Sequence, residues 1–309
     1  MLGKIEVILN SSFSILHSSF SILHSMIPLI AFQGEPGAYS EIAAGRLGRP
    51  EGRRRFVDVF EAVTAGQVAL GAIPLENSLG GTIHENYDLL LKYPVRIVAE
   101  TYVPINHCLM GLPQATLEQA RQVLSHPQAL AQCDVFLASH PEWEIIPAYD
   151  TAGSAKMVRE AGDPTRLAIA SEQAAGHYQL QVLARNIAST TNNITRFGFI
   201  QAESNLSPLP VPQSSDLIST SRKTTLAFTL AHKTGSLFQA LCVFAFREIN
   251  LTKIESRPFR EQAFNYLFYA DFIEPEDPKI SARALDHLSE IAPFLKILGS
   301  YPCVGTMEF

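Results

Sequence analysis

Cysteine is scarce in this chain, with four residues among 309. Cys108, Cys133, Cys242 and Cys303 are widely separated and form neither a CxxC pair nor a spacing typical of His/Cys metal ligands. A disulfide framework and a structural zinc site both require cysteines in such patterns, so the sequence argues against both. The pattern favours reduced thiols in a cytoplasmic protein.

Motifs that bind nucleotides or catalytic zinc are also missing. The chain contains no GxGxxG loop, no Walker loop and no HExxH helix, and residues 34–37 supply two glycines but no third. The histidines are scattered and form no pair at helical i, i+4 spacing. Dinucleotide, nucleotide and zincin chemistry therefore lack support, and we expect no metal.

Positive charge is in deficit. The formal net charge is −6 and the pI is near 5.9, which argues against a nucleic-acid groove or a polybasic membrane surface. The one basic run, Arg53–Arg55, follows a turn and is expected on a solvated face. With 47 % hydrophobic residues, the chain is long enough for two domains with their own cores.

Long apolar runs are absent from the first 25 residues, which carry an identical duplication of seven residues at 11–17 and 18–24. Serine and histidine interrupt each apolar stretch, so neither a membrane helix nor a signal peptide is expected. We interpret residues 1–25 as a dispensable extension and Met26 as the physiological start. Deleting this segment should preserve activity.

From residue 26 the pattern is that of an α/β protein, in which apolar strands alternate with helices and favour a mostly parallel sheet. Long strands near 95–110 and 195–201 are expected to cross between two lobes with a cleft between them. The expected strands include 28–32, 56–60, 70–73, 95–103, 107–110, 123–124, 145–146 and 167–170. The expected helices include 61–68, 83–91, 117–122 and 127–137.

The C-terminal third has a different organisation. A linker rich in serine and proline at 204–223 separates the α/β region at 26–203 from a module at 224–303. The module reads strand, helix, strand, strand, helix, strand. This βαββαβ order predicts a ferredoxin-like fold, which commonly serves ligand binding or dimerisation.

Polar residues gather where strands are expected to end and helices to begin. In α/β sheets such corners hold ligands, because free N–H groups at helix N-termini favour anions. Gln128 and Gln132 lie four residues apart and therefore on one helix face. Thr195, Arg196 and Phe197 offer a hydroxyl, a cation and a ring for a small anionic substrate. The corners are 34–40, 74–78, 125–128 and 150–154.

In order and spacing, these segments resemble the prephenate dehydratase family. The resemblance rests on residues 31–40, 73–78, 125–128 and 193–197. In the tail, Thr234–Leu237 and Glu255–Pro258 resemble the glycine-leucine turn and the ESRP segment of that family's ACT regulatory module. The resemblance implies a catalytic domain of two lobes with the type II periplasmic-binding-protein plan, followed by an ACT domain.

The resemblance implies a hydro-lyase that converts prephenate to phenylpyruvate without a cofactor, inhibited by phenylalanine in feedback control of phenylalanine biosynthesis. It implies a homodimer or homotetramer formed through the ACT domains. Thr195 would be the essential catalytic residue. The implied substrate-binding residues are Asn77, Ser78, Ser125, Gln128, Gln132, Thr151, Arg196 and Phe197. The implied phenylalanine-binding residues are Gly235, Ser236, Leu237, Glu255, Ser256, Arg257 and Pro258.

Two alternatives stay open at this point. Arogenate dehydratase performs the same chemistry on a substrate with an amine in place of the keto group, and the motifs do not separate the two. A two-lobed binding or sensor protein would use the same α/β plan without turnover. It would give the hydroxyl of Thr195 no special importance.

Overall fold

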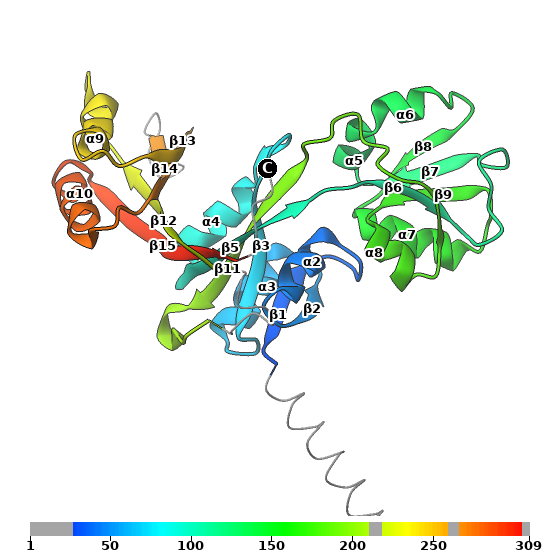
Figure 1. Ribbon diagram of the computed structural model, residues 1–309, viewed down its shortest axis with the longest axis horizontal. Coiled ribbons are helices and arrows are strands. Elements are labelled where there is room, and N and C mark those ends of the chain that lie inside the picture. The colour runs from blue at the N-terminus through cyan, green and yellow to red at the C-terminus, as the bar shows by residue number, and fades with distance from the viewer. Residues whose placement is uncertain (1–26, 210–217, 259–265, 305–309) are drawn as a thin grey trace, which may run out of the picture.

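The computed structural model describes residues 27–209, 218–258 and 266–304, so the expectation for residues 1–25 lies outside it. Figure 1 shows two α/β lobes and a C-terminal module in a row, with the first lobe in the middle. Among the described residues, no helix is both long and apolar enough to span a membrane.

Lobe 1 is built on a mixed sheet in the order β2-β1-β3-β11-β5. The first three strands run parallel, and β11 runs antiparallel to both of its neighbours. The strands are β1 (Leu29–Gln33), β2 (Arg49–Arg53), β3 (Leu70–Asn77), β5 (Val95–Pro104) and β11 (Ile194–Ala202), with the short β4 (Gly81–Thr82) on β3. The helices are α2 (Tyr39–Gly45), α3 (Phe56–Thr64) and α4 (His84–Lys92).

Lobe 2 has its own sheet in the order β10-β6-β9-β7-β8, in which β7, β8 and β9 are parallel. Its strands are β6 (Cys108–Gly111), β7 (Gln122–Ser125), β8 (Glu144–Pro147), β9 (Arg166–Ala170) and β10 (Gln181–Ala184). Its helices are α5 (Pro127–Gln132), α6 (Asp134–Ala138), α7 (Thr151–Ala161) and α8 (Glu172–His177).

Two chain crossings join the lobes, one from β5 to β6 and one from β10 to β11. They are bonded to each other, since Ile105 N donates to Asn193 O (2.8 Å) and Ile187 N to His107 O (3.1 Å). The predicted two-lobed plan with long crossing strands is confirmed. The sheets are mixed rather than mostly parallel, because each crossing strand enters its sheet antiparallel to a neighbour.

Three predicted elements are wrong. Residues 56–60 form the start of α3, not a strand. The letters Phe-Val-Asp-Val-Phe alternate, but the buried set Val59, Phe60, Ala62 and Val63 follows helical spacing. Residues 117–121 are turns and coil instead of a helix, and the helix expected at 127–137 is interrupted at Cys133.

The C-terminal module has the predicted βαββαβ order, and its sheet runs β13-β14-β12-β15. Its elements are β12 (Ile218–Thr229), α9 (Ser236–Ala245), β13 (Leu251–Pro258), β14 (Tyr266–Ile273), α10 (Pro278–Ile291) and β15 (Phe294–Val304). Strand β12 therefore begins inside the predicted linker at 204–223.

The module packs directly on lobe 1. Strand β15 lies beside β5, with Cys303 opposite Glu100, so the two sheets join edge to edge. Tyr269 and Tyr301 of the module share a buried apolar cluster with Tyr87 and Ile200 of lobe 1. This shared core fixes the module against the strand that carries Thr195.

Candidate active site

A cavity of about 530 Å³ lies between the two lobes and contains much of the predicted site. The part of the wall that belongs to lobe 1 comes from α2, the segment around β4 and β11. The part that belongs to lobe 2 comes from α5 and the start of α7. Five predicted residues line it, namely Asn77, Gln128, Gln132, Thr151 and Phe197, together with the predicted catalytic Thr195. The remaining polar lining includes Tyr39, Ser40, Thr82, His107, His126 and Asp150.

Thr195 is held by the side-chain amide of Asn77. The two residues are partners in the β3–β11 pairing, and Asn77 Nδ2 lies 3.0 Å from Thr195 Oγ1. The amide cannot be turned round, because its Oδ1 accepts hydrogen bonds from Gly80 N (2.7 Å) and Leu79 N (3.1 Å). Asn77 therefore donates and Thr195 Oγ1 accepts. The proton of the Thr195 hydroxyl is left available to a molecule in the cavity.

A chain of side chains continues from Asn77 across the gap between the lobes. Asn77 Nδ2 also donates to Asn193 Oδ1 (2.7 Å), and Asn193 Nδ2 donates to Gln132 Oε1 (2.9 Å). The same Gln132 oxygen lies 2.9 Å from His107 Nε2. With its oxygen engaged by two donors, Gln132 turns its own NH₂ group to the cavity as a donor.

His107 and Asn193 were not predicted as site residues. Because Gln132 Oε1 can only accept, the proton of the His107 ring is on Nε2, and Nδ1 faces the Tyr39 hydroxyl at 3.4 Å. Burial lowers the pKa of His107, so its ring is neutral near pH 7. Asn193 stands in the recognised motif and could have been chosen. His107 carries no signal in the sequence, since it is one of several scattered histidines.

The cavity wall is short of cations. Among the described residues that line it there is no lysine or arginine, and its one carboxyl is Asp150. Asp150 caps α7 by accepting from Ala152 N (2.7 Å) and Gly153 N (3.3 Å). Burial raises its pKa, although these N–H groups oppose the shift. The N-terminal end of α4 lies at the cavity through Ile83 and favours anions there, whereas the first N–H groups of α7 are already taken by Asp150.

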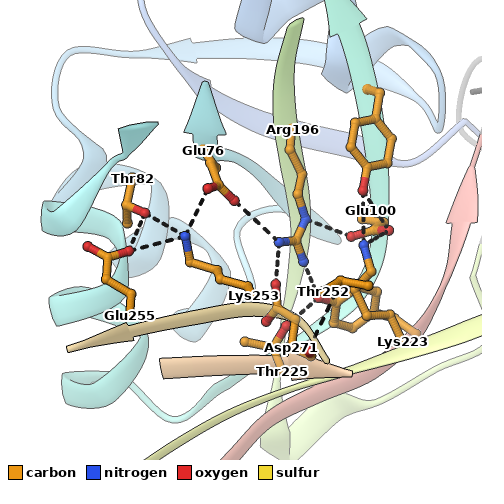
Figure 2. Close-up of polar contacts among 12 residues, drawn as sticks. Glu76, Thr82, Glu100, Arg196, Lys223, Thr225, Thr252, Lys253, Glu255 and Asp271 are labelled. Atoms are coloured by element: carbon orange, nitrogen blue, oxygen red, sulfur yellow. Dashed lines mark hydrogen bonds and ion pairs between the residues drawn. The ribbon is translucent and has the colours of Figure 1, made fainter. Parts of the chain in front are cut away.

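The prediction that Arg196 binds substrate at the cavity is wrong. Successive side chains on β11 point to opposite faces, so Thr195 and Phe197 face the cavity while Arg196 turns to the C-terminal module. Its Nε donates to Glu100 (2.7 Å), its Nη2 to the Tyr301 hydroxyl (2.7 Å), and its Nη1 to Asp271. Figure 2 shows this buried contact between the module and lobe 1.

Arg196 remains a cation in this environment. Burial by itself would lower its pKa, but the charge of Asp271, with Tyr301 and Glu100, raises the pKa well above the usual value. Asp271 is fully buried and Arg196 is 6 % exposed. The guanidinium therefore bonds lobe 1 to the C-terminal module instead of facing the cavity.

Two predicted serines are also placed away from the cavity wall. Ser125 is fully buried, and its hydroxyl donates to Ile169 O (2.6 Å) between β7 and β9. Ser78 donates to Asn192 O (2.8 Å) and accepts from Ile194 N (3.0 Å). Both hydroxyls satisfy backbone groups, and Ser78 secures the start of β11 beside Thr195.

The residues predicted to bind phenylalanine lie on two parts of the module. Gly235 precedes α9 with a left-handed φ of 82°, and Ser236 and Leu237 begin that helix. On β13, Glu255 and Arg257 face lobe 1, where Glu255 meets Thr82 and Arg257 pairs with Asp88 (2.7 Å). Ser256 and Pro258 alternate with them and are exposed.

Contacts between the lobes surround the cavity. Glu35 of lobe 1 accepts from the Tyr149 hydroxyl (3.1 Å) and pairs with Lys156 (3.2 Å), both in lobe 2. Ser171 Oγ donates to Gly37 O (2.5 Å). Gly37 has a left-handed φ of 89°, and a Cβ there would lie 2.4 Å from Ala174 Cα. A glycine at this position therefore lets the lobes approach.

The described residues contain no group of three or more His, Cys, Asp or Glu side chains that could hold a metal ion. The expectation of a reaction without metal or cofactor stays a prediction.

Comparison with known proteins gives the family. The family model described as "Prephenate dehydratase" matches residues 30–205. The Arabidopsis thaliana protein "Arogenate dehydratase/prephenate dehydratase 2, chloroplastic" is 42 % identical over 292 residues, which cover 90 % of this chain and 74 % of that protein.

Solved structures agree with the fold. The prephenate dehydratase from Arthrobacter aurescens in complex with L-Phe is 28 % identical, with a TM-score of 0.77 over 90 % of this chain and 93 % of that one. The structure described as GqqA, "a novel type of quorum quenching acylases", is 35 % identical, with a TM-score of 0.77 over 89 % of this chain and 98 % of that one. The predicted fold class is confirmed. The chain belongs to the prephenate dehydratase family and is a dehydratase of phenylalanine biosynthesis.

Proposed function

We propose that this protein is a prephenate dehydratase, which converts prephenate to phenylpyruvate, carbon dioxide and water. The observation that carries the proposal is the hydrogen bond from Asn77 to Thr195 at the cavity wall. Its direction leaves the threonine proton to a bound molecule. A hydroxyl donor on the wall matches a reaction whose leaving group is hydroxide, which must be protonated as it departs.

The reaction is an elimination with decarboxylation. The bond from the ring to the departing carboxylate breaks, and its electron pair enters the ring. The C4–O bond breaks at the other end, and the hydroxyl takes a proton and leaves as water, so that the ring becomes aromatic. In this arrangement Thr195 donates a hydrogen bond to the leaving oxygen. A free threonine hydroxyl is a weak acid, so we assign it the role of orienting the leaving hydroxyl and passing on a proton.

Neutral donors hold the dianionic substrate in this proposal. Gln128, Gln132 and Thr151 line the cavity, and the N-terminal end of α4 adds partial positive charge. Carboxylates bound without a nearby ammonium or guanidinium are poorly compensated. Poor compensation favours loss of the carboxylate that departs, provided that the other one is well anchored.

Arogenate dehydratase is the second candidate, and one observation favours it. Arogenate carries an ammonium group, and Asp150 places a carboxyl on the same cavity wall. The name of the A. thaliana relative contains both activities.

Phenylalanine is the proposed effector, acting on the C-terminal module as an ACT domain that pairs in a homodimer or homotetramer. The phenylalanine-bound structure of the A. aurescens protein supports a small-molecule effector. The cytoplasmic location likewise stays a prediction, because the A. thaliana relative is named as chloroplastic.

Turnover of purified full-length protein tests the function. We expect prephenate to give phenylpyruvate, with a kcat/KM higher than that for conversion of arogenate to phenylalanine. A higher kcat/KM for arogenate would establish the second candidate instead. An N-acyl amide serves as a third substrate because one similar structure is described as an acylase. Hydrolysis of that amide with no dehydration would overturn the proposal.

Gly37→Ala should impair closure of the lobes. The added Cβ meets the backbone of α8, and the left-handed φ adds strain. We expect kcat/KM for prephenate to fall by at least about 10-fold, because closure sets both binding and alignment. Gly66→Ala is the matched control in lobe 1, since Gly66 also has a left-handed φ (67°) but no atom within 4 Å of the added Cβ. Equal effects in the two variants would show that strain, not closure, is responsible.

A further inference from the structure

A seam of charged side chains joins strand β13 of the module to the segment of lobe 1 that carries Asn77. Along β13 the side chains alternate, and Lys253, Glu255 and Arg257 face lobe 1, where they contact Glu76, Thr82 and Asp88. Figure 2 shows Lys253 between Glu76, Thr82 and Glu255. Glu76 in turn lies 3.9 Å from Arg196, so the seam reaches the strand of Thr195.

Lys253 is the centre of this seam. Its side chain is 7 % exposed, and its ammonium lies over the ring of Tyr87 at 5.8 Å. Nζ donates to Thr82 Oγ1 (2.6 Å) and pairs with Glu76 Oε1 (3.0 Å) and Glu255 Oε2 (3.1 Å). An ammonium has three N–H donors, and three oxygens accept them here. The Thr82 hydroxyl accepts from Lys253 and donates to Glu255.

The two lobe 1 partners of Lys253 are the two ends of a tight hairpin. Strands β3 and β4 pair Glu76 with Thr82 and Asn77 with Gly81. Between them the chain folds back so that Gly80 N bonds to Asn77 Oδ1. Thr82 also lines the cavity. A group that holds Glu76 and Thr82 therefore sets the position of the Asn77 amide that bonds to Thr195.

We propose that Lys253 is a positioning residue of the active site, supplied by the C-terminal module. It clamps the hairpin of residues 76–82 and thereby keeps the Asn77 amide on Thr195. The inference rests on the proposed function, because its effect is measured on dehydration. It gives the module a part in basal turnover, in the absence of any effector.

Lys253→Met tests this role in the full-length protein with prephenate. The variant keeps the apolar stem of the side chain but removes the ammonium, so Glu76 and Glu255 repel and the hairpin shifts. We expect kcat to fall about 10- to 100-fold, because displacing a catalytic group by about 1 Å has effects of this size. KM should change by less than about 3-fold, since the lobe 2 donors are untouched. Lys253→Arg should recover part of the loss.

Lys296→Met is the matched control. Lys296 is also a module lysine in contact with lobe 1, but it donates to Leu90 O (2.9 Å) and Leu91 O (3.2 Å) at the end of α4, away from the hairpin. We expect its kcat to stay within about 2-fold of wild type. Equal losses of kcat in the two variants would show a general weakening of the interface and overturn the proposal.

Thr82→Val provides a second route that does not depend on how Lys253→Met folds. It removes the hydroxyl on which Lys253 acts, and we expect a similar loss of kcat. In the double variant the two losses should not add, because both break one contact. Wild-type kcat in a folded Lys253→Met or Thr82→Val protein would refute the inference. Absence of turnover in the wild type would refute the proposed function instead.

Discussion

Thr195→Val is expected to lower kcat by at least about 100-fold, the lower end for a group that takes part in proton transfer. Valine keeps the shape of threonine on β11 but provides no hydroxyl to meet the leaving oxygen. It also leaves one donor of the Asn77 amide without its acceptor, although Asn193 still accepts from the same nitrogen (2.7 Å). Steady-state rates with prephenate measure the effect.

The control for this variant is Thr195→Ser, which retains the hydroxyl and should keep most of the activity. KM of the valine variant should stay near that of wild type, because Gln128, Gln132 and Thr151 are unchanged. A Thr195→Val protein with near-normal turnover would contradict the assignment of Thr195. The group that donates to the leaving hydroxyl would then be one of the other donors on the cavity wall.

Arg196→Met is expected to destabilise the protein by about 3–5 kcal/mol, which is the usual cost of removing one partner of a buried ion pair. The variant leaves Asp271 fully buried without its cation, whereas Glu100 keeps Lys223 at 2.7 Å. The free energy of unfolding in urea measures the loss. The expectation follows from the placement of Arg196 between lobe 1 and the module.

Arg222→Met is the matched control for stability. Its side chain is 49 % exposed and pairs with Glu274 at 3.3 Å on the module surface. Exposed pairs contribute at most about 1 kcal/mol, so this variant should be close to wild type. A double variant, Arg196→Met with Asp271→Leu, should recover much of the loss by removing the unpaired carboxylate. An Arg196→Met protein as stable as Arg222→Met would contradict the buried role.

Strand β11 shows how much of the site a sequence motif can predict. The motif at 193–197 led to Thr195 and Phe197, which both line the cavity, but treating its three side chains as one group also placed Arg196 there. Alternation along a strand separates Arg196 from its neighbours, and applying it would have removed Arg196 from the cleft. That rule alone does not show what the opposite face meets. Asp271 and Tyr301 come from a part of the chain about 75 to 105 residues away.

Helix α3 and Ser125 show what local sequence does not decide, namely the type of a short element and the partner of a polar side chain. Residues 56–60 satisfy both a strand and a helix pattern over a short window, and packing on the sheet decided for the helix. Ser125 had the residue type of a ligand group, yet the nearest acceptor is the backbone of β9. Local sequence does not show which polar atoms the fold will leave without a partner. In the fold, Gln132 lines the cavity, whereas the hydroxyl of Ser125 is used by the backbone of β9.

The sequence by itself determined the family, the α/β pattern and the βαββαβ order of the module, and it singled out Thr195 as the candidate catalytic residue, because these depend on periodicity and on local motifs. The tertiary structure decided what depends on contacts between distant segments. It directed the Asn77 amide to Thr195, recruited His107 and Asn193, and turned Arg196 and Lys253 to the interface between lobe 1 and the module. A hydrogen bond or a buried charge acquires its partner through the fold, and no pattern within one segment contains that partner.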